Sequence, residues 1–268
     1  MDKPTMFEPR SVAPDTEALT SYVPVPGYGI LPVNAFLIHS AQPVLVDTGL
    51  YSLSNDFIKR LRSIIDLKDL RWLWLTHIHP DHIGSLRQIL AEAPNMRLIT
   101  TFQGMAIMGL FQIEIPMDRV YLLNPDQSLD IGDRKLLAIK PPSFDASEST
   151  GFFDTKTKVL FIVDCFGALM KEPADSAADI APSDLRDGLI TWATIDAPWL
   201  HVVDKGKFSE SLNVIRRLEP GVILSSHLPP AADMTEILLK HLASAVSAPP
   251  FVGPDQAAFE RMLAGVSG

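Results

Sequence analysis

Three histidines and one aspartate lie within the short segment His77-Ile78-His79-Pro80-Asp81-His82. Imidazole nitrogens and carboxylate oxygens are the protein ligands that bind zinc, iron and manganese. The chain has only seven histidines among 268 residues. Three of them in one short segment therefore indicate a metal site rather than a chance cluster on a surface loop.

The elements expected on either side of this segment divide its ligands into two groups. A buried strand is predicted at 71–76 and a helix from about 81 to 93. Alternate side chains of an extended stretch point the same way, so His77 and His79 can reach one ion. Where the chain turns into the helix, Asp81 and His82 point toward a neighbouring position, and a carboxylate also favours a helix start. One small cation rarely takes all four side chains from so short a loop, so the sequence predicts two adjacent ions.

Two later strand ends carry further candidate ligands. Asp164 ends the apolar run 158–163, where a carboxylate is costly unless it is paired or bound to a cation. We therefore predict Asp164 as the ligand that bridges both ions. His227 follows a predicted strand at 222–225, and we predict it as the last ligand.

Strand-like apolar runs and helical patterns alternate along the chain. This interleaving favours a layered α/β architecture with helices outside packed sheets. No repeat or linker is visible, so we expect a single domain over 1–268, with C-terminal helices within 233–268 packed on it. The other expected strands lie at 34–39, 43–47, 97–100, 134–140 and 151–155, and the other expected helices at 54–66, 183–197, 206–218, 233–246 and 254–264.

The composition argues against several classes of partner. A net charge of −9 and a sequence pI near 5.2 argue against a surface that neutralises phosphates, so nucleic acid is not an expected partner. One cysteine, Cys165, allows no internal disulfide, and the start lacks the apolar stretch of a secretory signal. The most apolar run, 159–170, is too short to span a bilayer. We expect a cytoplasmic protein without a membrane partner.

The motif His77-x-His79-x-Asp81-His82 resembles that of the metallo-β-lactamase superfamily, and Asp47-Thr48-Gly49 is similar to its strand-end signature. The resemblance implies a four-layer αββα sandwich, in which two mixed sheets are flanked by helices. It also implies that Asp47 orients a metal-bound imidazole. In the resulting dinuclear site, one ion is held by His77, His79 and a further ligand, the other by Asp81, His82 and His227, and both by Asp164.

The further ligand of the first ion departs from the superfamily pattern. Most members have a histidine in the turn before the bridging aspartate, but the stretch 139–153 contains none. Asp145 stands where that histidine should fall, so we predict Asp145 as the substitute ligand, with Glu148 as the alternative. A third reading is that this ion binds weakly or has been lost, which would leave a non-catalytic protein.

The segments Leu160-Phe161-Ile162-Val163-Asp164-Cys165-Phe166-Gly167 and 223–227 resemble the β-lactamase-like domain of flavodiiron proteins and their stand-alone relatives, the oxygen-binding diiron proteins. Those relatives typically carry glutamate at the second motif position and histidine later, where this chain has His79 and Asp145. Such a mixed nitrogen and oxygen set suits zinc, iron and manganese alike. Two divalent ions are therefore expected, without a choice of metal.

Two activities are compatible with this site. The first is a dinuclear metal-dependent hydrolase of a small-molecule ester, lactone, thioester or phosphodiester, in which a metal-bridging water attacks and Asp81 orients that water or accepts its proton. The alternative is a non-haem diiron protein that binds or reduces dioxygen. Only about forty residues follow His227, too few for a flavodoxin module, so this alternative requires an external electron donor. We rank the hydrolase first, and expect the apolar helices after residue 183 to offer an interface for a homo-oligomer.

Overall fold

Two mixed β-sheets form the centre of the computed structural model, which describes residues 3–266. In the first sheet β5 to β8 run parallel, and the pairs formed by β1 to β5 are antiparallel. In the second sheet only β12 and β13 form a parallel pair. The first sheet contains β1 (Thr5–Met6), β2 (Arg10–Ala13), β3 (Thr16–Val25), β4 (Gly29–Ile38), β5 (Val44–Val46), β6 (Trp72–Trp74), β7 (Arg97–Thr100) and β8 (Val120–Leu122). The second contains β9 (Ser128–Asp130), β10 (Lys135–Ile139), β11 (Gly151–Asp154), β12 (Val159–Phe161), β13 (Val222–Leu224) and β14 (Ala231–Ala232).

Alternating side chains pack the two sheets against each other. Val44 and Val46 of β5 belong to the hydrophobic cluster between the sheets, whereas Leu45 belongs to the cluster under the helices. In β12, Phe161 faces the other sheet and Leu160 faces the helices. Because side chains of a strand alternate between its faces, an uninterrupted apolar run gives each short strand two buried faces.

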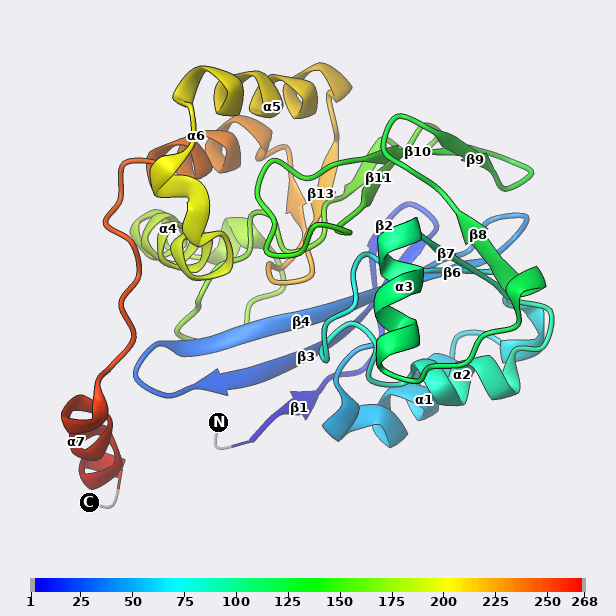
Figure 1. The fold of residues 1–268 in the computed structure, drawn as a ribbon, viewed down its shortest axis with the longest axis horizontal. Helices are drawn as coiled ribbons and strands as arrows, with labels where there is room; N and C mark the ends of the chain where they lie inside the picture. Colours follow the sequence, from blue (N-terminus) through cyan, green and yellow to red (C-terminus); the bar gives the residue numbers. More distant parts are fainter. Residues whose placement is uncertain (1–2, 267–268) are drawn as a thin grey trace.

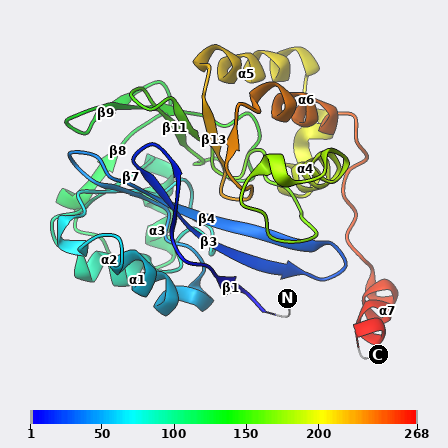
Figure 2. The ribbon, with the colours of Figure 1, turned by 180° about the vertical axis from the view of Figure 1, so that it is seen from behind.

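Helices cover the outer face of each sheet (Figures 1 and 2). On the first sheet lie α1 (Ser54–Arg62), α2 (Leu86–Glu92) and α3 (Phe102–Leu110); on the second lie α4 (Pro182–Asp196), α5 (Lys205–Leu218) and α6 (Thr235–Ala245). This arrangement of helices, two sheets and helices confirms the predicted α/β class and the four-layer αββα sandwich.

The C-terminal helices behave differently from each other. Helix α6 packs on the core through Leu238, Leu239 and Leu242. Helix α7 (Gln256–Val266) lies beside the tip of the β3–β4 hairpin, where Met262 approaches Gly27. Residues 1–2 and 267–268 of the predicted single domain lie outside the described residues, and the single domain stays a prediction. None of the helices within residues 3–266 is long and apolar enough to cross a membrane.

The helix predicted from residue 81 begins only at Leu86, so this boundary was wrong. Backbone hydrogen bonds to the segment after β5 hold the preceding loop: Thr48 N donates to His82 O at 2.7 Å, and Gly84 N donates to Gly49 O at 2.8 Å. A helix from residue 81 would pair the His82 carbonyl with the N–H of residue 86, but Thr48 N already donates to this carbonyl. Asp81 therefore stands in a loop and not at a helix start.

Candidate dinuclear metal centre

The predicted ligands follow the carboxyl ends of strands in both sheets. In the first sheet β5 and β6 are parallel neighbours, and in the second β12 and β13 are. Strand β10 runs in the same direction as β12, because each is antiparallel to β11 between them. The segments after these strands therefore meet at one end of the sandwich, the usual place for sites in sheets with parallel strands.

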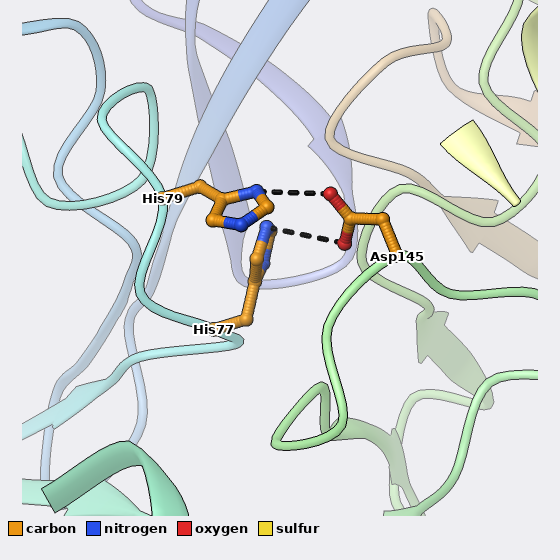
Figure 3. A group of neighbouring side chains, drawn as sticks. All are labelled: His77, His79 and Asp145. Atoms are coloured by element: carbon orange, nitrogen blue, oxygen red, sulfur yellow. Dashed lines mark ion pairs between the residues drawn. The ribbon is translucent and has the colours of Figure 1, made fainter. Parts of the chain in front are cut away.

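His77 and His79 point toward the carboxylate of Asp145, as Figure 3 shows. Asp145 Oδ2 lies 2.9 Å from His79 Nδ1, and Asp145 Oδ1 lies 3.8 Å from His77 Nε2. Ligand atoms of these three residues all lie within 4.8 Å of one another, a spacing at which one ion could hold them. The predicted partnership of Asp145 with the two histidines is present, whereas the alternative Glu148 is buried and belongs to none of the potential ligand groups among the described residues.

A second group contains Asp81, His82 and His227. Asp81 Oδ2 lies 3.5 Å from His82 Nε2 and 3.4 Å from His227 Nε2. Two ligand atoms at tetrahedral positions about 2.1 Å from one ion are separated by roughly 3.4 Å. The spacing of this group therefore fits a shared cation.

Asp164 lies between the two groups with one oxygen toward each. Its Oδ2 is 3.3 Å from His77 Nε2, and its Oδ1 is 3.2 Å from His82 Nε2 and 3.1 Å from His227 Nε2. Its carboxylate is 4% exposed. A carboxylate with an oxygen in each group is placed as the predicted bridge between two ions would be.

Buried polar atoms at the centre lack hydrogen-bond partners among the described residues. They are His77 Nε2, His82 Nε2 and Asp164 Oδ1. Leaving such groups unsatisfied costs about 1–3 kcal/mol each, and more if they are charged. Bound cations would satisfy all of them at once, so the residues present fit a dinuclear metal centre.

Neighbouring groups fix the ring orientation of two of the histidines. Asp47 Oδ2 accepts a hydrogen bond from His82 Nδ1 at 2.8 Å, and Pro32 O accepts one from His227 Nδ1 at 2.8 Å. Both oxygens can only accept, so each Nδ1 carries the proton and each Nε2 is left to bind a cation. The expected contact between Asp47 and a histidine of the motif is confirmed. Asp47 is itself held by Thr76, whose N and Oγ1 donate to its carboxylate at 2.9 and 2.7 Å.

The backbone before Asp164 is in a left-handed conformation. Val163 has φ +59°, which is unusual for a β-branched residue and costs of order 1–3 kcal/mol. Its carbonyl accepts hydrogen bonds from Ser225 Oγ at 3.0 Å and from Ser226 N at 2.8 Å. The segment that carries His227 thus also holds the turn that carries Asp164.

Burial and neighbouring charges shift the pKa values of the buried ligands. Burial lowers the pKa of His227, but the charge of Asp164 and the hydrogen bond to it raise this pKa to about 9. Burial raises the pKa of Asp164, but the charges of His77, His82 and His227 hold it well below its usual value. The pKa of His77 is lowered by burial and by the charge of His82. Metal ions would have to displace the protons on Nε2 of His82 and His227, while the Nδ1 protons stay in their hydrogen bonds.

Comparison with protein-family models decides the family. The model described as the ODP family beta lactamase matches residues 31–227, a range that includes every predicted ligand. The chain belongs to the ODP beta-lactamase family.

Three proteins that this ODP beta-lactamase chain resembles are named as oxidoreductases or flavoproteins. The anaerobic nitric oxide reductase flavorubredoxin of Salmonella typhi is 32% identical over 136 residues, which are 50% of this chain and 28% of that protein. The rubredoxin oxygen:oxidoreductase of Desulfovibrio gigas superposes with a TM-score of 0.77 at 17% identity, covering 90% of this chain and 61% of that one. A fragment of a putative diflavin flavoprotein from Nostoc sp. PCC 7120 gives 0.74 at 16% identity, covering 91% and 96%. The structural similarities establish the fold, and the chain spans only part of its curated relatives.

One buried acid beside the ODP beta-lactamase centre was not predicted. Asp196, the last residue of α4, offers a carboxylate oxygen within 4.8 Å of oxygens of Asp145 and Asp164. Burial and the charges of these two carboxylates raise its pKa to about 8. In the sequence Asp196 lies at the end of the predicted helix 183–197, and nothing in that pattern distinguishes it from a solvent-exposed helix end.

Proposed function

We propose that this protein holds two iron ions and reduces dioxygen with electrons from an external donor. The observation that carries this proposal is the pair of ligand groups joined by Asp164, within a family match that spans the whole centre. Relatives named as an oxygen oxidoreductase and a nitric oxide reductase support redox chemistry.

These relatives do not support the hydrolase that we rank first from the sequence, nor zinc as its metal. The same residues could activate a water, but each relative reported above is named as an oxidoreductase or a flavoprotein. We therefore favour the diiron alternative and withdraw the hydrolase. The role of Asp81 as proton acceptor belonged to the hydrolase, and in the present proposal Asp81 is a ligand.

The proposed ligands are divided as the sequence suggested. His77, His79 and Asp145 hold the first iron, and Asp81, His82 and His227 hold the second, with Asp164 bridging. When bound, the two irons supply reducing equivalents and open coordination positions. The histidines contribute differently: His77, His82 and His227 are buried, whereas the side chain of His79 is 42% exposed and that of Asp145 is 23% exposed. His79 is the most exposed of the proposed ligands, and Asp81 of the second group is also 27% exposed. Solvent and a small gas molecule can therefore reach the centre from the sides of both ions.

The stoichiometry explains why an electron donor is needed. Reduction of one dioxygen to two waters consumes four electrons and four protons. Two irons that each change their oxidation state by one provide only two electrons. An electron donor must therefore supply the other two electrons to the centre within each turnover. Nitric oxide is a second candidate substrate because the nitric oxide reductase relative aligns over half of the chain, and two nitric oxide molecules need two electrons and two protons to give nitrous oxide and water.

The test starts with protein purified without added metal and analysed for iron, manganese and zinc. Iron-loaded protein is then mixed with a chemical one-electron reductant, and oxygen or nitric oxide consumption is followed with an electrode. We expect about two irons per chain and gas consumption above the reductant blank. Asp164→Ala should lose both, whereas the exposed control Asp69→Asn should lose neither. Two zinc ions, no gas consumption after iron loading and turnover of an ester or lactone would overturn the proposal.

A further inference from the structure

Asp196 is a buried carboxylate without an assigned role. Only 7% of the residue is exposed, and the hydrogen bonds of the described residues include none made by its side chain. It stands at the end of α4, and one of its oxygens lies within 4.8 Å of oxygens of both Asp145 and Asp164. Three carboxylates therefore meet beside the first proposed iron.

The segments that carry Asp145 and Asp196 are fastened together. Trp199 lies three residues after Asp196 and donates from Nε1 to Phe144 O at 2.8 Å, and the rings of Trp199 and Phe144 lie 5.1 Å apart. The neighbour of Phe144 in the chain is Asp145. The approach of Asp196 to Asp145 is thus set by a packed aromatic contact and a hydrogen bond, and not by two loops that meet by chance.

This cluster has an unsatisfied histidine nitrogen directed into it. His77 is 1% exposed and its Nε2 has no hydrogen-bond partner among the described residues, yet it lies 3.3 Å from Asp164 and 3.8 Å from Asp145. Burying three carboxylates side by side is costly, because like charges repel strongly where water is excluded. A cation placed among them would neutralise the three carboxylates and would lie beside His77 Nε2, which approaches two of them.

We propose that Asp196 is an additional carboxylate ligand of the first metal ion. This inference rests on the proposed dinuclear centre. Two atoms that bind one ion on opposite sides lie at most about 4.2 Å apart. The distances from the Asp196 oxygen to the oxygens of Asp145 and Asp164 are within 4.8 Å, so they exceed this limit by no more than about 0.6 Å. The first ion then has two histidines and three carboxylates, an oxygen-rich set that favours iron or manganese over softer cations.

The experiment is an anaerobic titration of the metal-free protein with Mn²⁺, which counts the sites and measures their affinities. Asp196→Asn keeps the size of the side chain and cannot ionise, so it adds no charge repulsion and folding should be retained. We expect one of the two sites to bind at least tenfold more weakly, and Asp196→Ala to weaken it further. Asp187→Asn, which changes an exposed carboxylate of the same helix, should bind like the unaltered protein.

A second readout reports coordination rather than affinity. Co²⁺ absorbs visible light more intensely as its coordination number falls, so Asp196→Asn should intensify the spectrum of the Co²⁺-loaded protein. Asp145→Asn tests the dinuclear centre separately from the role of Asp196. If Asp145→Asn weakens one site while both Asp196 variants bind two ions normally with an unchanged spectrum, Asp196 is not a ligand and the dinuclear centre stands. If Asp145→Asn also leaves two normal sites, the proposed centre itself is wrong, and the inference on Asp196 is overturned with it.

Discussion

Replacing Asp47 by asparagine should disable one ligand of the centre without opening a cavity. The carboxylate accepts hydrogen bonds from His82 Nδ1 at 2.8 Å and from Thr76 N and Oγ1 at 2.9 and 2.7 Å. Asparagine has nearly the same shape but only one accepting oxygen. If its amide nitrogen faces His82, Nδ1 must accept, and the ring proton moves to Nε2, where it blocks metal binding. If the amide is flipped, the nitrogen faces the buried N–H of Thr76 instead.

The expected magnitudes follow from these contacts. An unsatisfied buried donor costs about 1–3 kcal/mol of folding stability, and loss of a group that orients a ligand costs about 10–100-fold in metal affinity. Asp47→Asn should therefore weaken one of the two sites by that factor and leave the other close to normal. The assay is anaerobic competition between the protein and a coloured chelator for Fe²⁺ or Mn²⁺, together with thermal unfolding of the metal-free protein.

Asp69 is an exposed aspartate in the turn before β6, and Asp69→Asn is the matched control. A variant Asp47→Asn with both normal metal affinity and normal thermal stability would refute this reasoning, because either orientation of the amide leaves His82 Nδ1 or Thr76 N without its acceptor. Equal weakening of both sites would also refute it, since the contacts of Asp47 reach only His82 among the proposed ligands.

Three further predictions concern the same centre. Gly167→Ala would place a Cβ 2.5 Å from Trp192 Nε1 and 2.7 Å from His227 Cβ. This substitution should lower the stability by about 1–3 kcal/mol in thermal unfolding and weaken the second site in a metal titration. The control Gly109→Ala should do neither, because its Cβ meets nothing within 4 Å. His227 has its pKa raised from 6.5 to about 9, so its stabilisation of the metal-free protein is complete below pH 6.5 and is lost as the pH rises through 9, by about 3 kcal/mol. The melting temperature should fall over that window with a chelator present and stay level with metal bound. A melting temperature that stays level with the chelator and falls with metal bound would contradict the prediction. His79→Ala should release one ion by elemental analysis and Asp164→Ala both; retention of two ions by either variant would count against the assignment.

The centre was more predictable than the elements around it. The motif 77–82 is local, so its residue types and spacing already specify what it can bind. Asp164 and His227 are distant in sequence but were recognisable, because each follows a strand that was itself an evident apolar run. Asp145 required the family resemblance as well, since an aspartate in a loop is otherwise an ordinary turn residue.

Other features depended on tertiary structure and left no local trace. Strand β3 (Thr16–Val25) contains polar residues and a proline, and its long pairing with β4 buries it all the same. Helix α3 contains two glycines, which lower helix propensity, yet Met108 packs it on the first sheet. Asp196 became notable only when α4 placed it beside two acids from other segments.

The centre also joins the two sheets of the sandwich. His77 and His82 follow β6 of the first sheet, whereas Asp164 and His227 follow β12 and β13 of the second. Protein contacts already cross this junction: Asn34 Nδ2 of β4 donates to Ser225 O and Leu228 O at 2.9 Å each, and His227 donates to Pro32 O. These contacts hold His227 in place before any cation arrives. Because each ion would take ligands from both sheets, its binding free energy adds to the stability of the interface between them. Metal loss should therefore lower the free energy of unfolding of the sandwich as well as remove the chemistry.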